Sequence, residues 1–311
     1  MIQPYLAFAT PRKLPKAKDL PGRVVVLDIA FASEASGGGF HGITGPFIKD
    51  IGDRLAMWVD HHDHALHAKY NEDGRFLLRS KQQHGACPEM ITPALVERAG
   101  SIGTIVCHMD FDGLMSAAKW IRGGVEVYEG ADSDARAIDT RVGVPSANAA
   151  RVDRAIRARI RDAGFCGLVV NHMVGGMKDA GLWKLIDAAG AELDAVEKRT
   201  REIARGYRVV DLPKPWLSAA GGKATRVAVL RLSEGGKGYD KTQLLLDGQN
   251  RADIALVTDK GNLTLAAPFD SGLDFLKLFG LSGGMPTLVS VPDTRIEQLI
   301  SAWGLKHGDL D

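Results

Sequence analysis

The sequence has little cysteine and few aromatic residues. Of its 311 residues, 3 are cysteine and 6% are phenylalanine, tryptophan or tyrosine. The cysteines, Cys87, Cys107 and Cys166, are odd in number and lack metal-ligand spacing. A disulfide framework and a zinc knuckle are therefore excluded, and the cysteine content fits a reducing cytosol.

Net charge is almost absent too. The chain carries 39 Lys and Arg residues against 38 Asp and Glu residues, which gives a formal net charge of +1 at pH 7. A protein that grips many phosphates along a duplex normally has a strongly basic surface. The balance therefore favours a small substrate or a short single strand, but a local basic groove would not show in the sum.

Long hydrophobic runs are also missing. No apolar stretch approaches the length needed to span a bilayer. Residues 1–5 lack the charged start and apolar core of a signal peptide. We therefore expect no membrane partner and a cytoplasmic location.

The apolar runs that are present alternate with segments of helical character. Short runs at 24–27, 55–59, 104–107, 125–128 and 167–172 indicate buried strands. Alternation of this kind predicts an α/β domain whose parallel sheet is covered by helices on both faces. Residues 1–22 indicate an irregular leader, and residues 177–205 a long helix.

A second, smaller α/β domain is expected at the C-terminal end. Strands are predicted at 226–232, 254–258 and 263–266, with a hairpin turn at 259–262. Proline and glycine concentrate in residues 211–224, which indicates a linker. The predicted domains are therefore 1–210 and 225–311, in keeping with the length of the chain.

One predicted helix is strongly basic, and Ser146 is expected to cap it. Such a helix usually presents a solvated face, and a phosphate-binding face is the alternative. Its arginines are Arg151, Arg154, Arg157, Arg159 and Arg161.

The most informative stretch is Asp60-His61-His62-Asp63-His64, which follows the apolar run 55–59. Carboxylates and imidazoles at the end of a buried strand lose solvation, and a divalent metal is the usual compensation. Taken alone, the stretch is better explained as a solvated histidine-rich turn. A second cluster of the same kind favours the metal.

That second cluster follows the run 104–107, as His108-Met109-Asp110-Phe111-Asp112-Gly113. Alternate residues of an extended segment point the same way, so His108, Asp110 and Asp112 share one side. Asp28 ends the run 24–27, and ligands bind at the carboxyl edge of open α/β sheets. Carboxylates mixed with imidazole suit manganese well and magnesium less well, and no thiolates for structural zinc are present.

These residues resemble the motifs of the DHH phosphoesterase superfamily, with its RecJ-like and nanoRNase-like members. Asp60-His61-His62 is similar to the signature, Asp28 to a lone Asp that bridges two manganese ions, and 108–113 to the first motif. Here the H-x-D-x-D motif follows the signature instead of preceding it, so the resemblance implies a rearranged sheet. Residues 130–141 resemble the fourth motif, in which Asp132, Asp134 and Asp139 compete for the last ligand position.

The resemblance implies a DHH-type catalytic domain with two Mn²⁺ ions, Mg²⁺ being possible. His108, Asp110 and Asp28 would hold one ion. The other ion would be held by Asp112, Asp28, His61 and Asp132. Asp60 would orient His61, and His62 would contact the substrate phosphate or protonate the leaving oxygen. Arg141, at the end of the fourth motif, would bind substrate.

The C-terminal part resembles the substrate-binding domain associated with this family. Its glycine-rich loop is represented by Gly283 and Gly284, which would help to hold the substrate. Met285 stands where the family has histidine, so altered substrate contacts are expected.

The function expected from these observations is a manganese-dependent phosphoesterase. Its substrate would be a small nucleotide, namely a short oligonucleotide, a cyclic dinucleotide or a 3′-phosphonucleotide. The alternative is a RecJ-like exonuclease acting on single-stranded nucleic acid. A catalytically weak nucleotide sensor is a third hypothesis, of another class, and a homodimer is left open.

Overall fold

The computed structural model describes residues 4–34, 38–159, 161–232, 238–306 and 308–310. The chain divides into two compact units, Met1–Glu192 and Leu193–Asp311. Each unit has its own sheet and its own hydrophobic core. Among the described residues, no helix is both long and apolar enough to cross a bilayer.

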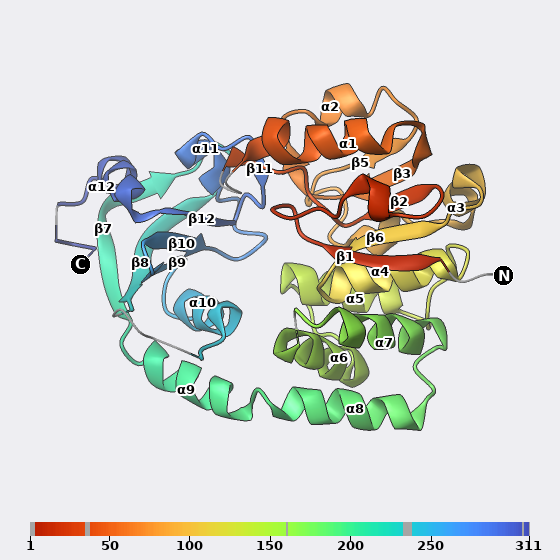
Figure 1. The fold of residues 1–311 in the computed structure, drawn as a ribbon. Helices are drawn as coiled ribbons and strands as arrows, with labels where there is room; N and C mark the ends of the chain where they lie inside the picture. Colours follow the sequence, from red (N-terminus) through yellow and green to blue (C-terminus); the bar gives the residue numbers. More distant parts are fainter. Residues whose placement is uncertain (1–3, 35–37, 160, 233–237, 307, 311) are drawn as a thin grey trace. The chain divides into compact units, whose positions relative to one another are not determined.

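The first unit is built on a five-stranded sheet with the order β1-β6-β2-β3-β5 (Figure 1). All neighbouring strands run parallel. The strands are β1 (Tyr5–Ala9), β2 (Val24–Leu27), β3 (Leu55–Asp60), β5 (Phe76–Leu78) and β6 (Thr104–His108). The predicted α/β class, with a parallel sheet flanked by helices, is confirmed.

Both faces of this sheet are buried because its strands are apolar throughout. On β2, Val25 and Leu27 belong to one core, while Val24 and Val26 belong to another. This division follows from the two-residue period of a strand. A parallel sheet of this kind needs helical crossovers, and these cover the two faces.

Helices α1 and α2 contribute Phe47 and Tyr70 to the core that contains Val24, whereas α4 to α7 pack in the core that contains Val25. The helices of the first unit are α1 (Gly45–Ile51), α2 (His67–Tyr70), α3 (Pro93–Ala99), α4 (Phe111–Ile121), α5 (Ala131–Thr140), α6 (Ala147–Ala158), α7 (Ala163–Val174) and α8 (Ala180–Ala191). Shorter elements are η1 (Ala17–Asp19), η3 (Phe40–Thr44), η4 (Gly52–Arg54), η5 (Cys87–Met90) and the strand β4 (Asp63–His64).

The second unit contains a separate mixed sheet with the order β12-β10-β9-β8-β7. The pair β8–β9 is parallel, and the other neighbours are antiparallel. Its strands are β7 (Arg208–Leu217), β8 (Lys223–Arg231), β9 (Ile254–Asp259), β10 (Asn262–Ala266), β11 (Gly283–Gly284) and β12 (Leu288–Pro292). Its helices are α9 (Asp194–Ala204), α10 (Lys241–Gln249), α11 (Phe275–Phe279), η6 (Asp293–Arg295) and α12 (Ile296–Trp303).

The predicted domain boundary and linker differ from the observed division. The units part between Glu192 and Leu193, not near residue 210. Residues 211–224 are not a linker, because they lie in β7 and the start of β8. β7 is an edge strand with an irregular register between Asp211 and Trp216. An edge strand tolerates Pro213 and Pro215, since their missing N–H groups cost no ladder hydrogen bond.

Other predicted elements were also wrong. Residues 5–9, placed in the irregular leader, form β1 beside β6. The run 125–128 is not a strand, and it follows a turn in which Gly123 and Gly124 have positive φ. Residues 167–172 lie inside α7, because periodicity alone does not separate a short buried strand from a buried helix. The predicted long helix at 177–205 is two helices, α8 and α9.

Candidate metal centre

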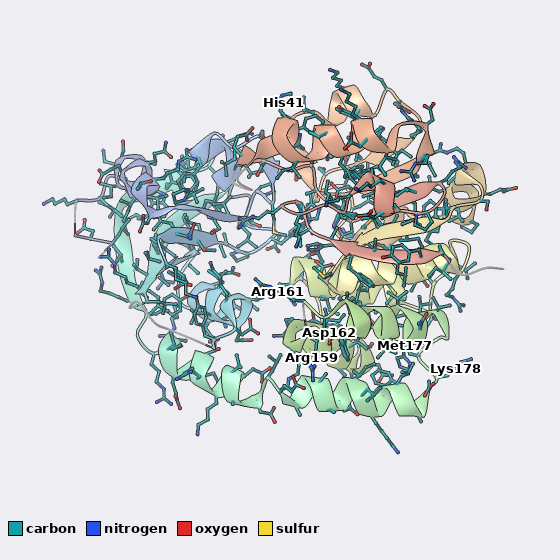
Figure 2. The ribbon with its side chains drawn as sticks, in the orientation of Figure 1. His41, Arg159, Arg161, Asp162, Met177 and Lys178 are labelled. Atoms are coloured by element: carbon teal, nitrogen blue, oxygen red, sulfur yellow. The ribbon has the colours of Figure 1, made fainter. Side chains whose placement is uncertain are left out.

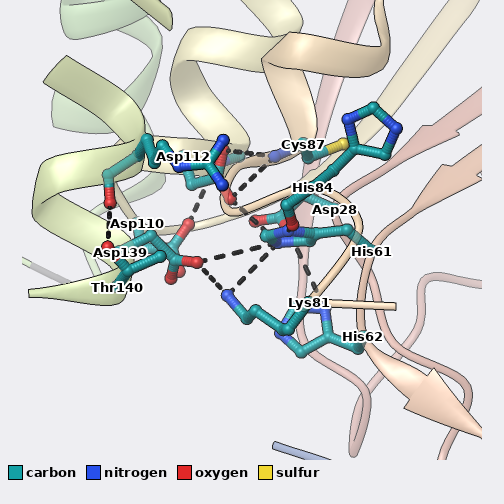
Figure 3. A network of polar contacts seen from close by, with 12 residues as sticks. Asp28, His61, His62, Lys81, His84, Cys87, Asp110, Asp112, Asp139 and Thr140 are labelled. Atoms are coloured by element: carbon teal, nitrogen blue, oxygen red, sulfur yellow. Dashed lines mark hydrogen bonds and ion pairs between the residues drawn. The ribbon is translucent and has the colours of Figure 1, made fainter. Parts of the chain in front are cut away.

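The candidate site lies at the carboxyl edge of three neighbouring strands. Leu27 of β2 pairs with Cys107 of β6 on one side and Val59 of β3 on the other. The residues that follow these three positions are Asp28, His108 and Asp60, so they stand next to one another. The parallel register therefore gathers three motifs that are far apart in the sequence (Figure 3).

Asp28 is the central residue of the cluster. Its side chain is 1% exposed, and neither carboxylate oxygen has a hydrogen-bond partner. Burial raises the pKa of Asp28 well above its ordinary value, and the charges of Asp112 and Asp110 raise it further. The backbone at Asp28 has φ 56°, a conformation that Asp and Asn adopt more readily than most residues. A buried carboxylate without hydrogen bonds calls for a cation.

His61 points one nitrogen at the protein and the other at the carboxylates. Its Nδ1 lies 2.9 Å from the carbonyl oxygen of His84. Because a carbonyl only accepts, Nδ1 carries the proton. Nε2 lies 3.0 Å from Asp112 Oδ2 and 3.2 Å from Asp28 Oδ1. A metal-binding imidazole is commonly oriented by such a contact to its other nitrogen.

The position of Nε2 requires a positive charge, either a second proton or a metal ion. Burial and the charge of Lys81 lower the pKa of His61, but the Asp112 and Asp28 carboxylates outweigh them and raise it to about 10. In the metal-free chain, His61 is therefore an imidazolium.

His108 and Asp110 form a close pair on the other side of Asp28. His108 Nδ1 is 2.7 Å from Asp110 Oδ2 and 3.9 Å from Asp28 Oδ2. Asp110 also caps α4 by accepting a hydrogen bond from the backbone N–H of Gly113. Burial lowers the pKa of His108, but Asp110 and Asp28 outweigh burial and raise it to about 9.

Asp60 contacts His62, not His61. Its Oδ1 lies 2.8 Å from His62 Nδ1, and its Oδ2 accepts from the His62 backbone N–H. The expected orientation of His61 by Asp60 is not observed, because the carbonyl of His84 takes that place. Burial lowers the pKa of His62 more than Asp60 raises it. At 21% exposure, His62 is the open member of the DHH triplet, since Asp60 and His61 are fully buried.

Asp112 and Asp139 complete the cluster. Asp112 is 2% exposed and accepts hydrogen bonds from the backbone N–H of Cys87 at 3.0 and 3.2 Å. Asp139, near the end of α5, has its Oδ2 3.8 Å from His61 Nε2. It also forms an ion pair with Lys81, which is 2% exposed.

The geometry fits a divalent metal. Three groups of residues each bring their ligand atoms within 4.8 Å of one another. Oxygen and imidazole donors of this kind suit manganese or magnesium. The unpartnered oxygens of Asp28 are the clearest sign of a cation that belongs there. The groups are Asp28-His61-His62, Asp28-His108-Asp110 and His61-Asp112-Asp139.

The structure does not bring Asp132 into this cluster. Asp132 Oδ2 lies 2.5 Å from Lys119 Nζ, so its charge is already paired. Asp134 accepts hydrogen bonds from Tyr128 and from Ser146, which ties α5 to the start of α6. Of the three competing carboxylates, Asp139 therefore takes the predicted position of Asp132.

The expected substrate-binding residues have different placements. Arg141 is exposed, follows Asp139 by two residues and has φ 61°. Gly283 and Gly284 form β11 in the second unit, where Gly284 has φ 131°. A residue with φ this positive favours glycine at that position. Lys81 and the carbonyl of His84 were missed by the sequence analysis, because they lie in an irregular polar segment without periodicity.

The basic helix is α6, capped by Ser146 as predicted. Arg151 pairs with Asp187 and Arg157 with Asp153. Arg159 pairs with Glu192, and Arg159 and Arg161 stand beyond the end of the helix (Figure 2). These pairs agree with a solvated face whose arginines are locally neutralised.

No family model matches this chain, and none of the curated proteins searched matches it significantly. The functional argument therefore rests on the geometry of the cluster.

Replacement of Asp28 by asparagine tests the metal assignment. The amide side chain would keep the shape and suit the positive φ, but it would remove the unpaired buried charge. We expect Asp28→Asn to raise the free energy of unfolding of the metal-free protein by on the order of 1 kcal/mol. We also expect it to abolish Mn²⁺ binding measured by calorimetry.

Asp132→Asn is the matched control. It removes one carboxylate of the same unit that lies outside the cluster, so Mn²⁺ binding should be retained. Unchanged Mn²⁺ affinity in Asp28→Asn would show that the cluster is not the metal centre.

Proposed function

We propose that this chain is a divalent-metal-dependent phosphoesterase that hydrolyses phosphoester bonds of a small nucleotide. The observation that carries the proposal is the unpartnered, buried Asp28 between His61, His108, Asp110 and Asp112. Mn²⁺ is the ion that these donors suit best, and Mg²⁺ is the second choice. The DHH resemblance of the same residues supports the reaction class.

A divalent ion bound here would activate a water molecule and withdraw charge from a phosphoryl group. Asp28, His108 and Asp110 would hold such an ion from one side, and His61 with Asp112 from the other. The hydrogen bonds from Cys87 to Asp112 and from His61 to the His84 carbonyl fix these side chains before any ligand binds. Fixed ligands reduce the reorganisation that binding requires.

His62 is the residue that we propose to act on the substrate. Its Nδ1 is held by Asp60, which leaves Nε2 on the free side of the ring. Because burial lowers its pKa, His62 is neutral in the free chain at neutral pH. An incoming phosphate would favour the protonated form, which can contact a phosphate oxygen or deliver a proton to the leaving oxygen.

Substrate contacts outside the cluster are assigned to three residues. Arg141 is exposed and lies two residues beyond Asp139, so its guanidinium is a candidate for a phosphate oxygen. Gly283 and Gly284 of the second unit would let a substrate approach the backbone closely. A net charge of +1 favours a substrate with few phosphates.

The proposal is tested by nucleotide release from a panel of substrates with Mn²⁺ and with chelator. The panel holds a 5′-phosphorylated dinucleotide, a cyclic dinucleotide, a 3′,5′-bisphosphonucleoside and a longer single strand. We expect Mn²⁺-dependent cleavage of a short species, and a fall in kcat of about 10²–10⁴-fold in His62→Ala.

His41→Ala is the control for His62, since His41 is an exposed histidine of the same unit. It should leave kcat unchanged. No cleavage of any species, with Mn²⁺ bound, would contradict the enzyme and favour a nucleotide sensor.

One observation favours the exonuclease as a second candidate. A hollow of about 810 Å³ lies between residues 12–18 and α1, with Lys13, Lys16 and Lys18 on its rim. These lysines are exposed, and none forms an ion pair with a described residue. Residues 10–13 form a turn directly after Ala9, which pairs with His108. The hollow therefore begins at the edge of the sheet that carries the cluster.

This groove suits a phosphate backbone better than stacked bases. Leu14, Ile43 and Phe47 line it, but Phe47 is 5% exposed and offers little ring surface. General single-strand binders combine basic grooves with aromatic stacking. Only the electrostatic half of that requirement is met by the described lining, so the small-nucleotide hypothesis stays first.

Charge reversal in the groove separates the two candidates. If a long strand is the substrate, Lys13→Glu with Lys16→Glu should weaken its binding and reduce the salt slope of log K by about 1.4, or 0.7 for each contact. The control pair is Lys178→Glu with Lys184→Glu, which makes the same change of charge on an exposed surface elsewhere in the unit. Equal effects of the two pairs would exclude the groove as a strand-binding site.

A further inference from the structure

Lys81 is a buried cation inside the candidate metal centre. Its side chain is 2% exposed and reaches the cluster from the segment after β5. Its Nζ pairs with Asp139 Oδ2 and lies 3.3 Å from His61 Nε2 (Figure 3). A buried lysine is costly unless an opposite charge compensates it. Asp139 supplies that charge.

The place of Lys81 coincides with one of the three groups that could hold a metal ion. His61, Asp112 and Asp139 form that group, and Lys81 Nζ contacts two of its members. An ion bound to His61 Nε2 and Asp139 would therefore have to displace the ammonium group. It would also meet like charge at close range, since Lys81 cannot leave the pair without stranding a buried charge.

The group formed by Asp28, His108 and Asp110 is different. Both oxygens of Asp28 lack a hydrogen-bond partner, and no lysine or arginine contact to these three residues is present among the described ion pairs. A divalent ion can bind there by replacing the proton on His108 and relieving the charge repulsion at Asp28. The two positions therefore differ in what already neutralises them.

We infer that this centre holds one divalent cation, on Asp28, His108 and Asp110, and that Lys81 is a built-in cation at the second position. The inference rests on the metal-dependent function proposed above and refines it to a mixed centre of one ion and one ammonium. Lys81 acts as a positioning residue. It holds Asp139 and His61 in place and excludes a second ion.

The test is the number of Mn²⁺ ions bound by the full chain. Equilibrium dialysis with elemental analysis should give one ion for the wild type, and electron paramagnetic resonance should show an isolated Mn²⁺ ion. Lys81→Met keeps the length of the side chain but removes its charge. This variant should bind a second ion about tenfold or more tightly than the wild type does, with the spectrum of a coupled pair.

Lys119→Met is the matched control. Lys119 is the other buried lysine of the unit, 5% exposed, and it pairs with Asp132 and the carbonyl of Pro88. Its replacement also removes a buried ion pair, but outside the cluster, so one Mn²⁺ ion per chain should remain.

Two ions in the wild type would overturn the inference and leave the phosphoesterase proposal standing. One ion in Lys81→Met would overturn it as well, because Lys81 would then not be what excludes the second ion. One ion in the wild type without phosphoester hydrolysis would overturn only the proposed function. If Lys81→Met fails to fold, the wild-type stoichiometry and spectrum decide the question.

Discussion

The compensation of buried negative charge at the carboxyl edge of the first sheet is the constraint on which the site depends. Three parallel strands end in acidic residues there, and parallel pairing leaves them no freedom to separate. Asp60 is compensated by His62, Asp110 by His108 and Asp139 by Lys81. Asp28 has no hydrogen bond of its own, so the folded chain keeps a place for positive charge beside it.

This arrangement links stability to function. The apolar strands that bury Asp28 are the same strands that bring it beside His61 and His108. Rigid backbone contacts, from Cys87 to Asp112 and from His61 to the His84 carbonyl, hold the ligands in a crowded arrangement. A cation lowers the electrostatic cost of that crowding, and the same cation supplies the chemistry of phosphoester hydrolysis.

The strands of the site were predictable because their sequences are simple. The runs 24–27, 55–59 and 104–107 are uninterrupted and apolar, and each ends in a ligand-type residue. Since parallel strands share one carboxyl edge, Asp28, His61, His108, Asp110 and Asp112 had to gather whatever their order in the chain. The run 167–172 looked the same but lies in α7, because its length and composition also fit a buried helix.

The choice between Asp132 and Asp139 was beyond the sequence pattern. The two residues are seven positions apart on α5, so they share a face of the helix and differ mainly in axial position, by roughly 10 Å. Helical phase cannot separate them, and only the packing of α5 does. Lys81 gave no signal either, because it lies outside any periodic element and its role depends on a tertiary contact with Asp139.

The central claim is that the cluster around Asp28 is a divalent metal centre. Anomalous diffraction at the manganese absorption edge, from crystals grown with Mn²⁺, tests it most directly. The account predicts an anomalous peak bounded by the carboxylates of Asp28 and Asp110 and the imidazole of His108. Manganese found only on the surface, with no anomalous peak beside Asp28, would contradict it.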